Sequence, residues 1–137
     1  MIEYIEHAGL MTKVVKTHEI LYFNKPMITI IKNLCYDKLF SYEGYKKAVR
    51  KRLDMSYRLP LYIDEDLQLF PIENTRNYEN MWINSVLIKD IHMSEDGVSI
   101  TFFSMHKIYV NTSLNSINKQ IKRLNQIRNL LSKHFHV

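Results

Sequence analysis

Leu69-Phe70-Pro71-Ile72 and Met81-Trp82-Ile83-Asn84 are two apolar runs in the middle of the chain, separated by a polar, asparagine-rich loop over residues 73–80. Apolar residues also precede Asp64-Glu65-Asp66, so residues 59–72 predict two short strands joined by an acidic turn. Basic segments with helical character lie on both sides of this region. The central part of the chain is therefore expected to form antiparallel strands between two helices.

The strand pattern continues after the second apolar run. Residues 81–91 are rich in Ile, Val, Leu and Trp with partial alternation, and residues 98–110 have the same character. The segment from Ser94 to Gly97 between them is typical of a turn. These features predict a second β-hairpin.

The N-terminal third also has strand-like composition. Residues 11–23 are rich in Val, Thr, Tyr and Ile, and Asn24 with Pro26 marks a turn before a second apolar run over residues 27–34. This pattern predicts a hairpin of two strands. Cys35 lies in the strand-like run over residues 28–36, where it is expected to be a small buried hydrophobe rather than a nucleophile.

A basic amphipathic helix is predicted from an N-cap at Ser41 to about Leu53. Glu43 falls in the first turn, where the helix dipole favours an acid. On a 3.6-residue period the apolar and basic side chains separate onto two faces. The apolar face holds Tyr45, Ala48, Val49 and Leu53, and the basic face holds Lys46, Lys47, Arg50 and Lys51.

A long helix is predicted at the C-terminus, with Thr112 or Ser113 as its N-cap. Its apolar side chains recur at three- and four-residue steps, which predicts a stripe that forms core or a dimer seam. This stripe consists of Leu114, Ile117, Ile121, Leu124, Ile127, Leu130, Leu131 and Phe135. Lys119, Lys122, Arg123 and Lys133 lie mostly away from it, and Arg128 and His134 add to the positive side or interact with the C-terminal dipole.

These elements predict an α+β fold: an antiparallel sheet built from β-hairpins, with a basic amphipathic helix in the middle and a long C-terminal helix. A length of 137 residues fits a single domain over residues 1–137. With Met1 to His7 acidic rather than basic and the apolar runs short, neither an export signal nor a membrane span is expected. The protein is expected to be cytoplasmic.

Charge is distributed unevenly along the chain. The net charge is +5, and residues 97–137 hold six Lys and Arg with no carboxylate, whereas residues 61–96 hold two basic residues against eight acids. Such a basic segment attracts a polyanion over a Debye length of about 10 Å. Nucleic acid is the expected partner, although the positive charges could instead serve solubility and pair with the acidic middle third.

Several chemistries find no support in the sequence. Three glycines are too few for a phosphate-cradling or dinucleotide-binding loop, and the six histidines show no spacing typical of a zinc site. The three consecutive acids Asp64-Glu65-Asp66 are interpreted as a solvated turn rather than a metal site. No nucleophile motif is present. Neither an enzymatic activity nor a metal or other cofactor is expected.

Short matches in a fixed order resemble the bacterial competence transcription factors, the ComK family. They span roughly residues 21–133, and their order and spacing are stronger evidence than any single motif. From the N-terminal side the matches are Leu21-Tyr22-Phe23-Asn24 with Pro26, Ser41-Tyr42-Glu43-Gly44, Leu59-Pro60-Leu61-Tyr62-Ile63-Asp64, Phe70-Pro71, Trp82-Ile83, Thr101-Phe102, and the segment from Asn111 through Ser116 to Ile121 and Arg123.

The resemblance implies a transcription activator of competence (DNA-uptake) genes that is nucleoid-associated when bound to DNA. It implies binding, as a homodimer or pair of dimers, to double-stranded promoter boxes made of A and T tracts. RNA polymerase and an adaptor-protease system are the further partners that it implies. Longer members continue beyond the position of Val137 with a tail that takes part in turnover and assembly, and this chain is expected to be a short member without that tail.

The residues that contact DNA are predicted from their charge and from the helix face on which they lie. A-tracts have a narrow minor groove of enhanced negative potential that attracts Arg and Lys. Because no helix-turn-helix signature is present, no recognition helix in the major groove is expected. The candidate contacts, through the minor groove and the phosphate backbone, are Lys46, Lys47, Arg50, Lys51, Arg52, Lys119, Lys122 and Arg123.

Two positions depart from the family pattern. Members commonly carry a basic residue after the Gly of the Ser-x-x-Gly motif, where this chain has Tyr45. Ser104-Met105-His106 stands where an Asn-Gly turn is common, which predicts a different turn or one merged strand. An alternative function also stays open, in which the chain is a protein-interaction regulator that forms mixed or inactive oligomers with a longer family member.

Overall fold

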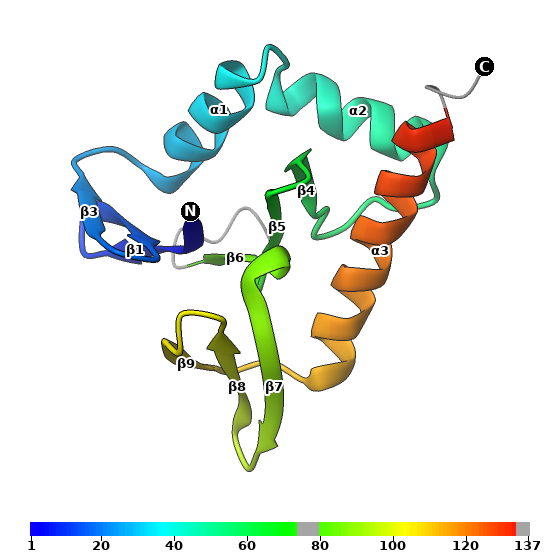
Figure 1. The fold of residues 1–137 in the computed structure, drawn as a ribbon. Coiled ribbons are helices and arrows are strands. Elements are labelled where there is room, and N and C mark those ends of the chain that lie inside the picture. Colours follow the sequence, from blue (N-terminus) through cyan, green and yellow to red (C-terminus); the bar gives the residue numbers. More distant parts are fainter. Residues whose placement is uncertain (74–79, 134–137) are drawn as a thin grey trace.

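The computed structural model describes residues 1–73 and 80–133, which form two antiparallel sheets and three helices (Figure 1). The predicted loop at residues 74–79, together with His134 and Phe135, lies outside the described residues. None of the described helices is long and apolar enough to cross a membrane. In chain order the elements are β1 (Ile2–Ala8), β2 (Met11–Lys16), β3 (Ile20–Phe23), α1 (Met27–Asp37), α2 (Tyr42–Arg52), β4 (Leu61–Asp64), β5 (Leu67–Pro71), β6 (Met81–Asn84), the 3₁₀ turn Ser85–Leu87, β7 (Ile88–Ser94), β8 (Gly97–Phe102), β9 (Lys107–Val110) and α3 (Leu114–Lys133).

The larger sheet has six strands in the order β3-β2-β1-β6-β5-β4, and the smaller one has three in the order β7-β8-β9. All neighbouring strands are antiparallel. The predicted α+β class, with antiparallel hairpins and a long C-terminal helix, is therefore confirmed. The predicted turn at Asp64-Glu65-Asp66 and the β7–β8 hairpin are also confirmed. In the turn, the Asp64 carboxylate accepts from the Asp66 amide at 2.8 Å.

The central strands of the six-stranded sheet are buried on both faces, which explains the two apolar runs there. Leu69 and Trp82 point into a cluster that α1 and the start of α2 cover. Their neighbours Phe70 and Ile83 point to the opposite face, into a cluster shared with the smaller sheet and α3. Because side chains alternate across a strand, burial on both sides requires apolar residues at successive positions. Trp82 is 2% exposed and is a core residue.

The predicted strand over residues 27–34 is wrong, because this segment begins helix α1. Its Ile and Thr residues are typical of strands, but Met27, Ile30, Ile31 and Cys35 recur at helical spacing and pack together against the sheet. Pro26 stands before the first turn, where its missing amide hydrogen costs nothing. Cys35 is fully buried, as expected, although in a helix, and burial raises the pKa of its thiol to about 11.

The predicted hairpin of strand 11–23 with strand 27–34 is also wrong. Residues 11–23 themselves form two paired strands, β2 and β3. The other partner of β2 is β1, which the sequence did not predict and which joins β2 through a turn at Gly9 with φ +62°. β1 then pairs with β6, with Ile5 opposite Trp82, so the N-terminus lies inside the larger sheet.

Residues 81–91, predicted as one strand, divide at Asn84 into β6 in the larger sheet and β7 in the smaller one. The Asn84 side chain is fully buried and makes four hydrogen bonds to the main chain. Residues 98–110 likewise divide into β8 and β9. Ser104-Met105-His106 forms a turn of its own type between them, with Met105 at φ +75°.

Helix α2 begins as predicted. The Ser41 hydroxyl accepts from the Gly44 amide at 3.0 Å, and Tyr42 and Val49 are the buried side chains of the helix. Tyr45 stands where the family pattern has a basic residue. Its side chain links α2 to the start of β4 by two hydrogen bonds. Its hydroxyl donates to the Pro60 carbonyl oxygen at 2.7 Å and accepts from the Tyr62 amide at 3.0 Å. Burial raises the pKa of Tyr45, so the hydroxyl keeps the proton that it donates.

We expect Tyr45→Phe to lower the free energy of unfolding by about 2 kcal/mol, because it leaves the Pro60 carbonyl and the Tyr62 amide without their partner. Urea denaturation monitored by Trp82 fluorescence measures the change. Tyr109→Phe, at a side chain that is 74% exposed, is the control and should change little. A Tyr45→Phe protein as stable as the parent would show that these two bonds contribute nothing.

Candidate nucleic-acid interface

Helix α2 presents most of its predicted contact residues to solvent. Tyr42 and Val49 turn inward, so Lys47, Arg50, Lys51 and Arg52 lie exposed on the remaining surface. Lys46 differs from them: it is partly buried, and its ammonium nitrogen lies 4.5 Å from the centroid of the Tyr42 ring. This cation–π contact holds the Lys46 side chain along the helix.

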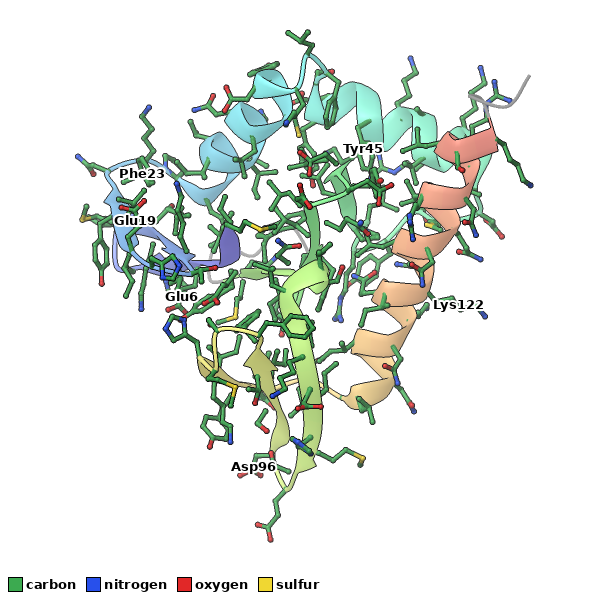
Figure 2. All side chains as sticks on the ribbon, in the orientation of Figure 1. Glu6, Glu19, Phe23, Tyr45, Asp96 and Lys122 are labelled. Carbon is green, nitrogen blue, oxygen red and sulfur yellow. The ribbon has the colours of Figure 1, made fainter. Side chains whose placement is uncertain are left out.

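The cations of α3 fall into two kinds. Lys119 and Lys122 are exposed, and Figure 2 shows Lys122 pointing away from the body of the protein. Arg123 is partly buried, and its Nη1 donates to the Tyr57 carbonyl oxygen at 2.7 Å. Burial lowers the pKa of its guanidinium below the usual value. Arg123 therefore makes a hydrogen bond within the protein, in addition to the DNA contact predicted for it.

Ion pairs explain which positive charges remain available. In the described part of the chain, carboxylates pair with Lys13, Lys16, Lys32, Lys38, Arg58 and Arg128. None of the eight predicted contact residues has a described carboxylate within 4.0 Å. Three acids of the middle third, Asp64, Glu65 and Glu73, pair with Lys38, Arg128 and Arg58 instead. The field of the eight cations is therefore not neutralised by close ion pairs within these segments.

The two basic segments approach each other where α2 ends. A hollow of about 380 Å³ is lined by residues 53–55, just after α2, and by Lys119, Lys122, Arg123 and Gln126 of α3. A small apolar cluster of Val49, Met55, Leu59 and Ile127 holds the two helices together beside it. The α3 cations and the C-terminal end of α2 therefore belong to one region of the surface.

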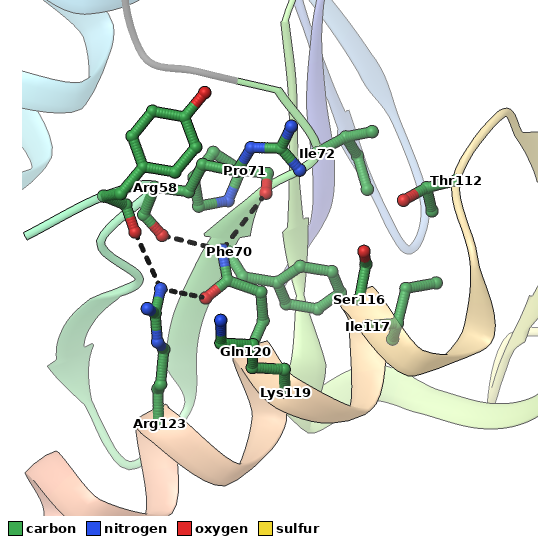
Figure 3. Close-up of a pocket in the computed structure, with 11 residues that line it drawn as sticks. Arg58, Phe70, Pro71, Ile72, Thr112, Ser116, Ile117, Lys119, Gln120 and Arg123 are labelled. Carbon is green, nitrogen blue, oxygen red and sulfur yellow. Dashed lines mark hydrogen bonds between the residues drawn. The ribbon is translucent and has the colours of Figure 1, made fainter. Parts of the chain in front are cut away.

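A further cation, Arg58, was missed by the sequence analysis. It lines a hollow of about 220 Å³ under the first half of α3, together with Lys119, Arg123, Thr112 and Ser116 (Figure 3). Arg58 lies between the predicted helix and the predicted strand, outside any periodic pattern. The one signal in the sequence was a basic residue between the two apolar residues Tyr57 and Leu59, which by itself predicts no site.

An apolar groove lies between α2 and the C-terminal half of α3. Its volume is about 620 Å³, and its lining includes Ala48, Leu53, Leu130, Leu131 and Arg52. The first half of the predicted α3 stripe is core, since Ile117, Leu124 and Ile127 are buried. Leu131, the last described residue of the stripe, is 43% exposed and remains available at the groove.

The described residues contain no group of three or more His, Cys, Asp or Glu side chains that could hold a metal ion. The one thiol, Cys35, is buried with a raised pKa and has low reactivity as a nucleophile. What the described surface offers is a set of unpaired cations on two adjoining helices. That arrangement is suited to a polyanion.

Comparison with known proteins gives two matches. A family model described as "ComK protein" matches residues 1–136. The competence transcription factor of Bacillus subtilis (strain 168) is 25% identical over 122 residues, which cover 87% of this chain and 64% of that protein. The chain therefore spans less than two thirds of the length of this relative. No solved structure matches.

Proposed function

Because the chain belongs to the ComK protein family, we propose that it is a transcription regulator of competence genes that acts by binding double-stranded DNA. The observation that carries this proposal is a set of exposed cations that have no described carboxylate within 4.0 Å, namely Lys47, Arg50, Lys51 and Arg52 of α2 and Lys119 and Lys122 of α3. Phosphate neutralisation by such side chains supplies nearly all of non-specific DNA affinity and a large share of specific affinity.

The proposed target is A/T-rich promoter DNA, contacted through the minor groove and the phosphate backbone. Exposed Lys and Arg side chains fit the enhanced negative potential of the narrow A-tract groove. The proposed contacts are Lys46, Lys47, Arg50, Lys51, Arg52, Lys119, Lys122 and Arg123. We further propose that residues 1–137 act in the cytoplasm as one DNA-binding domain that activates transcription as a homodimer or pair of dimers.

Affinity for two duplexes of equal length tests this function. One carries two A/T boxes one helical turn apart, and the other is G/C-rich. We expect the A/T duplex to bind at least tenfold more tightly, a difference of about 1.4 kcal/mol, with an affinity that falls steeply as salt rises. Fluorescence anisotropy over a range of salt concentrations gives both quantities. Weak and equal binding to the two duplexes would reject sequence-selective regulation.

The apolar groove between α2 and α3 favours a second candidate function. In this alternative the chain regulates by protein interaction and forms mixed or inactive oligomers with a longer family member, which would cover Leu131 and its neighbours. Sedimentation equilibrium of the chain alone and mixed with a longer member tests it. Monomers in both samples would reject this alternative, and mixed species that fail to bind DNA would support it.

A further inference from the structure

The hollow under the first half of α3 brings together three cations and two hydroxyl groups. Arg58 contributes from the connection between α2 and β4, and Lys119 and Arg123 contribute from α3. Thr112 and Ser116 line the same hollow, and Phe70, Pro71, Ile72 and Ile117 form its apolar part. Basic and hydroxyl side chains around one space of about 220 Å³ are the donor set that a phosphate group requires.

Arg58 is held in a costly backbone conformation. Its φ is +50°, in the left-handed region, which costs about 1 to 2 kcal/mol for a residue with a side chain. Two side chains of α3 hold this segment in place: Gln120 Nε2 donates to the Arg58 carbonyl oxygen at 2.7 Å, and Arg123 Nη1 donates to that of Tyr57 at 2.7 Å (Figure 3). Such conformations persist where the surroundings enforce them, and they concentrate at binding sites.

The Arg58 guanidinium retains hydrogen-bonding capacity. Its Nε is buried and has no hydrogen-bond partner among the described residues. Its Nη2 lies 4.0 Å from a carboxylate oxygen of Glu73, at the outer limit of an ion pair. Lys119 is exposed with no described carboxylate within 4.0 Å. An anion placed between these two side chains would accept from the Nη groups of Arg58, in competition with the Glu73 carboxylate.

We propose that Arg58 and Lys119, with Arg123 and the hydroxyls of Thr112 and Ser116, form a phosphate-binding pocket. This inference rests on the proposed function, because the phosphate that it assigns to the pocket is one of the DNA backbone. The fork of an Arg guanidinium bonds two phosphate oxygens at once, and Lys acts as a point charge beside it. A backbone phosphate held here would fix α3 against the duplex and set the register in which the α2 cations meet the DNA.

Salt-dependent affinity for the A/T duplex tests the pocket. We compare the parent with Arg58→Gln, Lys119→Gln, the double variant and Lys107→Gln, an exposed cation of β9 away from the pocket. One lost phosphate contact should reduce the slope of log affinity against log salt by about 0.9, which is about eightfold in affinity at 0.1 M salt. Arg58→Gln and Lys119→Gln should each approach this loss, and Lys107→Gln should not.

The double variant shows whether one phosphate is shared. Because Arg58 and Lys119 would hold the same group, their joint loss should be smaller than the sum of the single losses. Fully additive losses would mean separate phosphates and would overturn the pocket. Urea denaturation of each variant checks the fold, and the exposed Lys119→Gln remains informative if Arg58→Gln fails to fold.

Melting temperatures in inorganic phosphate and in chloride, at the same ionic strength, distinguish binding of a free anion from binding of the DNA backbone. If the parent binds the A/T duplex and the pocket variants bind it equally well, the pocket is wrong while the proposed function stands. If the parent fails to bind DNA but phosphate raises its melting temperature and not that of Arg58→Gln, the pocket stands with free phosphate as its ligand. If neither the duplex nor phosphate distinguishes the variants from the parent, the pocket proposal is overturned.

Discussion

Replacing Lys47, Arg50 and Lys51 of α2 with glutamine is expected to lower affinity for the A/T duplex by about 500-fold in 0.1 M salt. The estimate follows from counterion release: three lost phosphate contacts reduce the slope of log affinity against log salt by about 2.7. All three side chains are exposed, and none has a described carboxylate within 4.0 Å. Lys46 is left intact because its ammonium group packs on the Tyr42 ring, so its removal would disturb the helix itself.

The matched control removes the same charge from other surfaces. Lys25, Lys89 and Lys107 are exposed and lie outside α2 and α3, so Lys25→Gln, Lys89→Gln and Lys107→Gln together change the net charge equally. Anisotropy titrations over salt compare the two triple variants, and circular dichroism confirms their folds. An equal loss in both would mean that the positive charge acts generally, which would contradict α2 as a DNA contact surface. No loss in either would reject the contribution of α2 altogether.

Elements with local determinants were predictable from the sequence. Helix α2 begins at the predicted cap, where the Ser41 hydroxyl accepts from the Gly44 amide. Helix α3 follows its apolar stripe, and Ser113, one of two proposed caps, accepts from the Ser116 amide at 3.1 Å. Capping residues and a 3.6-residue period act within one or two turns of chain, so a sequence window contains the information that decides them.

Elements that depend on distant partners were not predictable. β1 is a central strand because it lies between β2 and β6, and nothing near Ile5 in the sequence indicates Trp82 as its neighbour. In α1 the β-branched residues favoured a strand, but packing of the helical stripe against the sheet overrides that preference. Tertiary packing supplies most of the stability of such short elements.

The candidate site likewise contains residues that could be predicted from the sequence and residues that could not. The exposed cations of α2 could be predicted, since their positions follow from helix periodicity alone. The bond from Arg123 to Tyr57 and the position of Arg58 could not, because the connection between α2 and β4 follows no repeating pattern. A left-handed conformation at an arginine, held by Gln120 from a helix 62 residues later, has no local signature.

Asn84→Asp is expected to lower the free energy of unfolding by about 3 kcal/mol. Asn84 is fully buried where the chain passes from the larger sheet to the smaller one. Its Oδ1 accepts from the amides of Gln68 at 3.1 Å and Val86 at 3.3 Å. Its Nδ2 donates to the carbonyl oxygens of Ile2 at 2.8 Å and Asp66 at 3.0 Å. One amide group thus satisfies four main-chain atoms from three segments: the start of β1, the turn into β5, and the 3₁₀ turn that follows β6.

An aspartate has nearly the same shape but only oxygen atoms. It keeps the two accepted bonds, and its second oxygen faces the carbonyl oxygens of Ile2 and Asp66, which are left without donors. Urea denaturation monitored by Trp82 fluorescence measures the loss, with Asn125→Asp on the exposed face of α3 as the control. A loss below about 1 kcal/mol would mean that water replaces the missing donors, and Asn84 would then not be the residue that joins the two sheets.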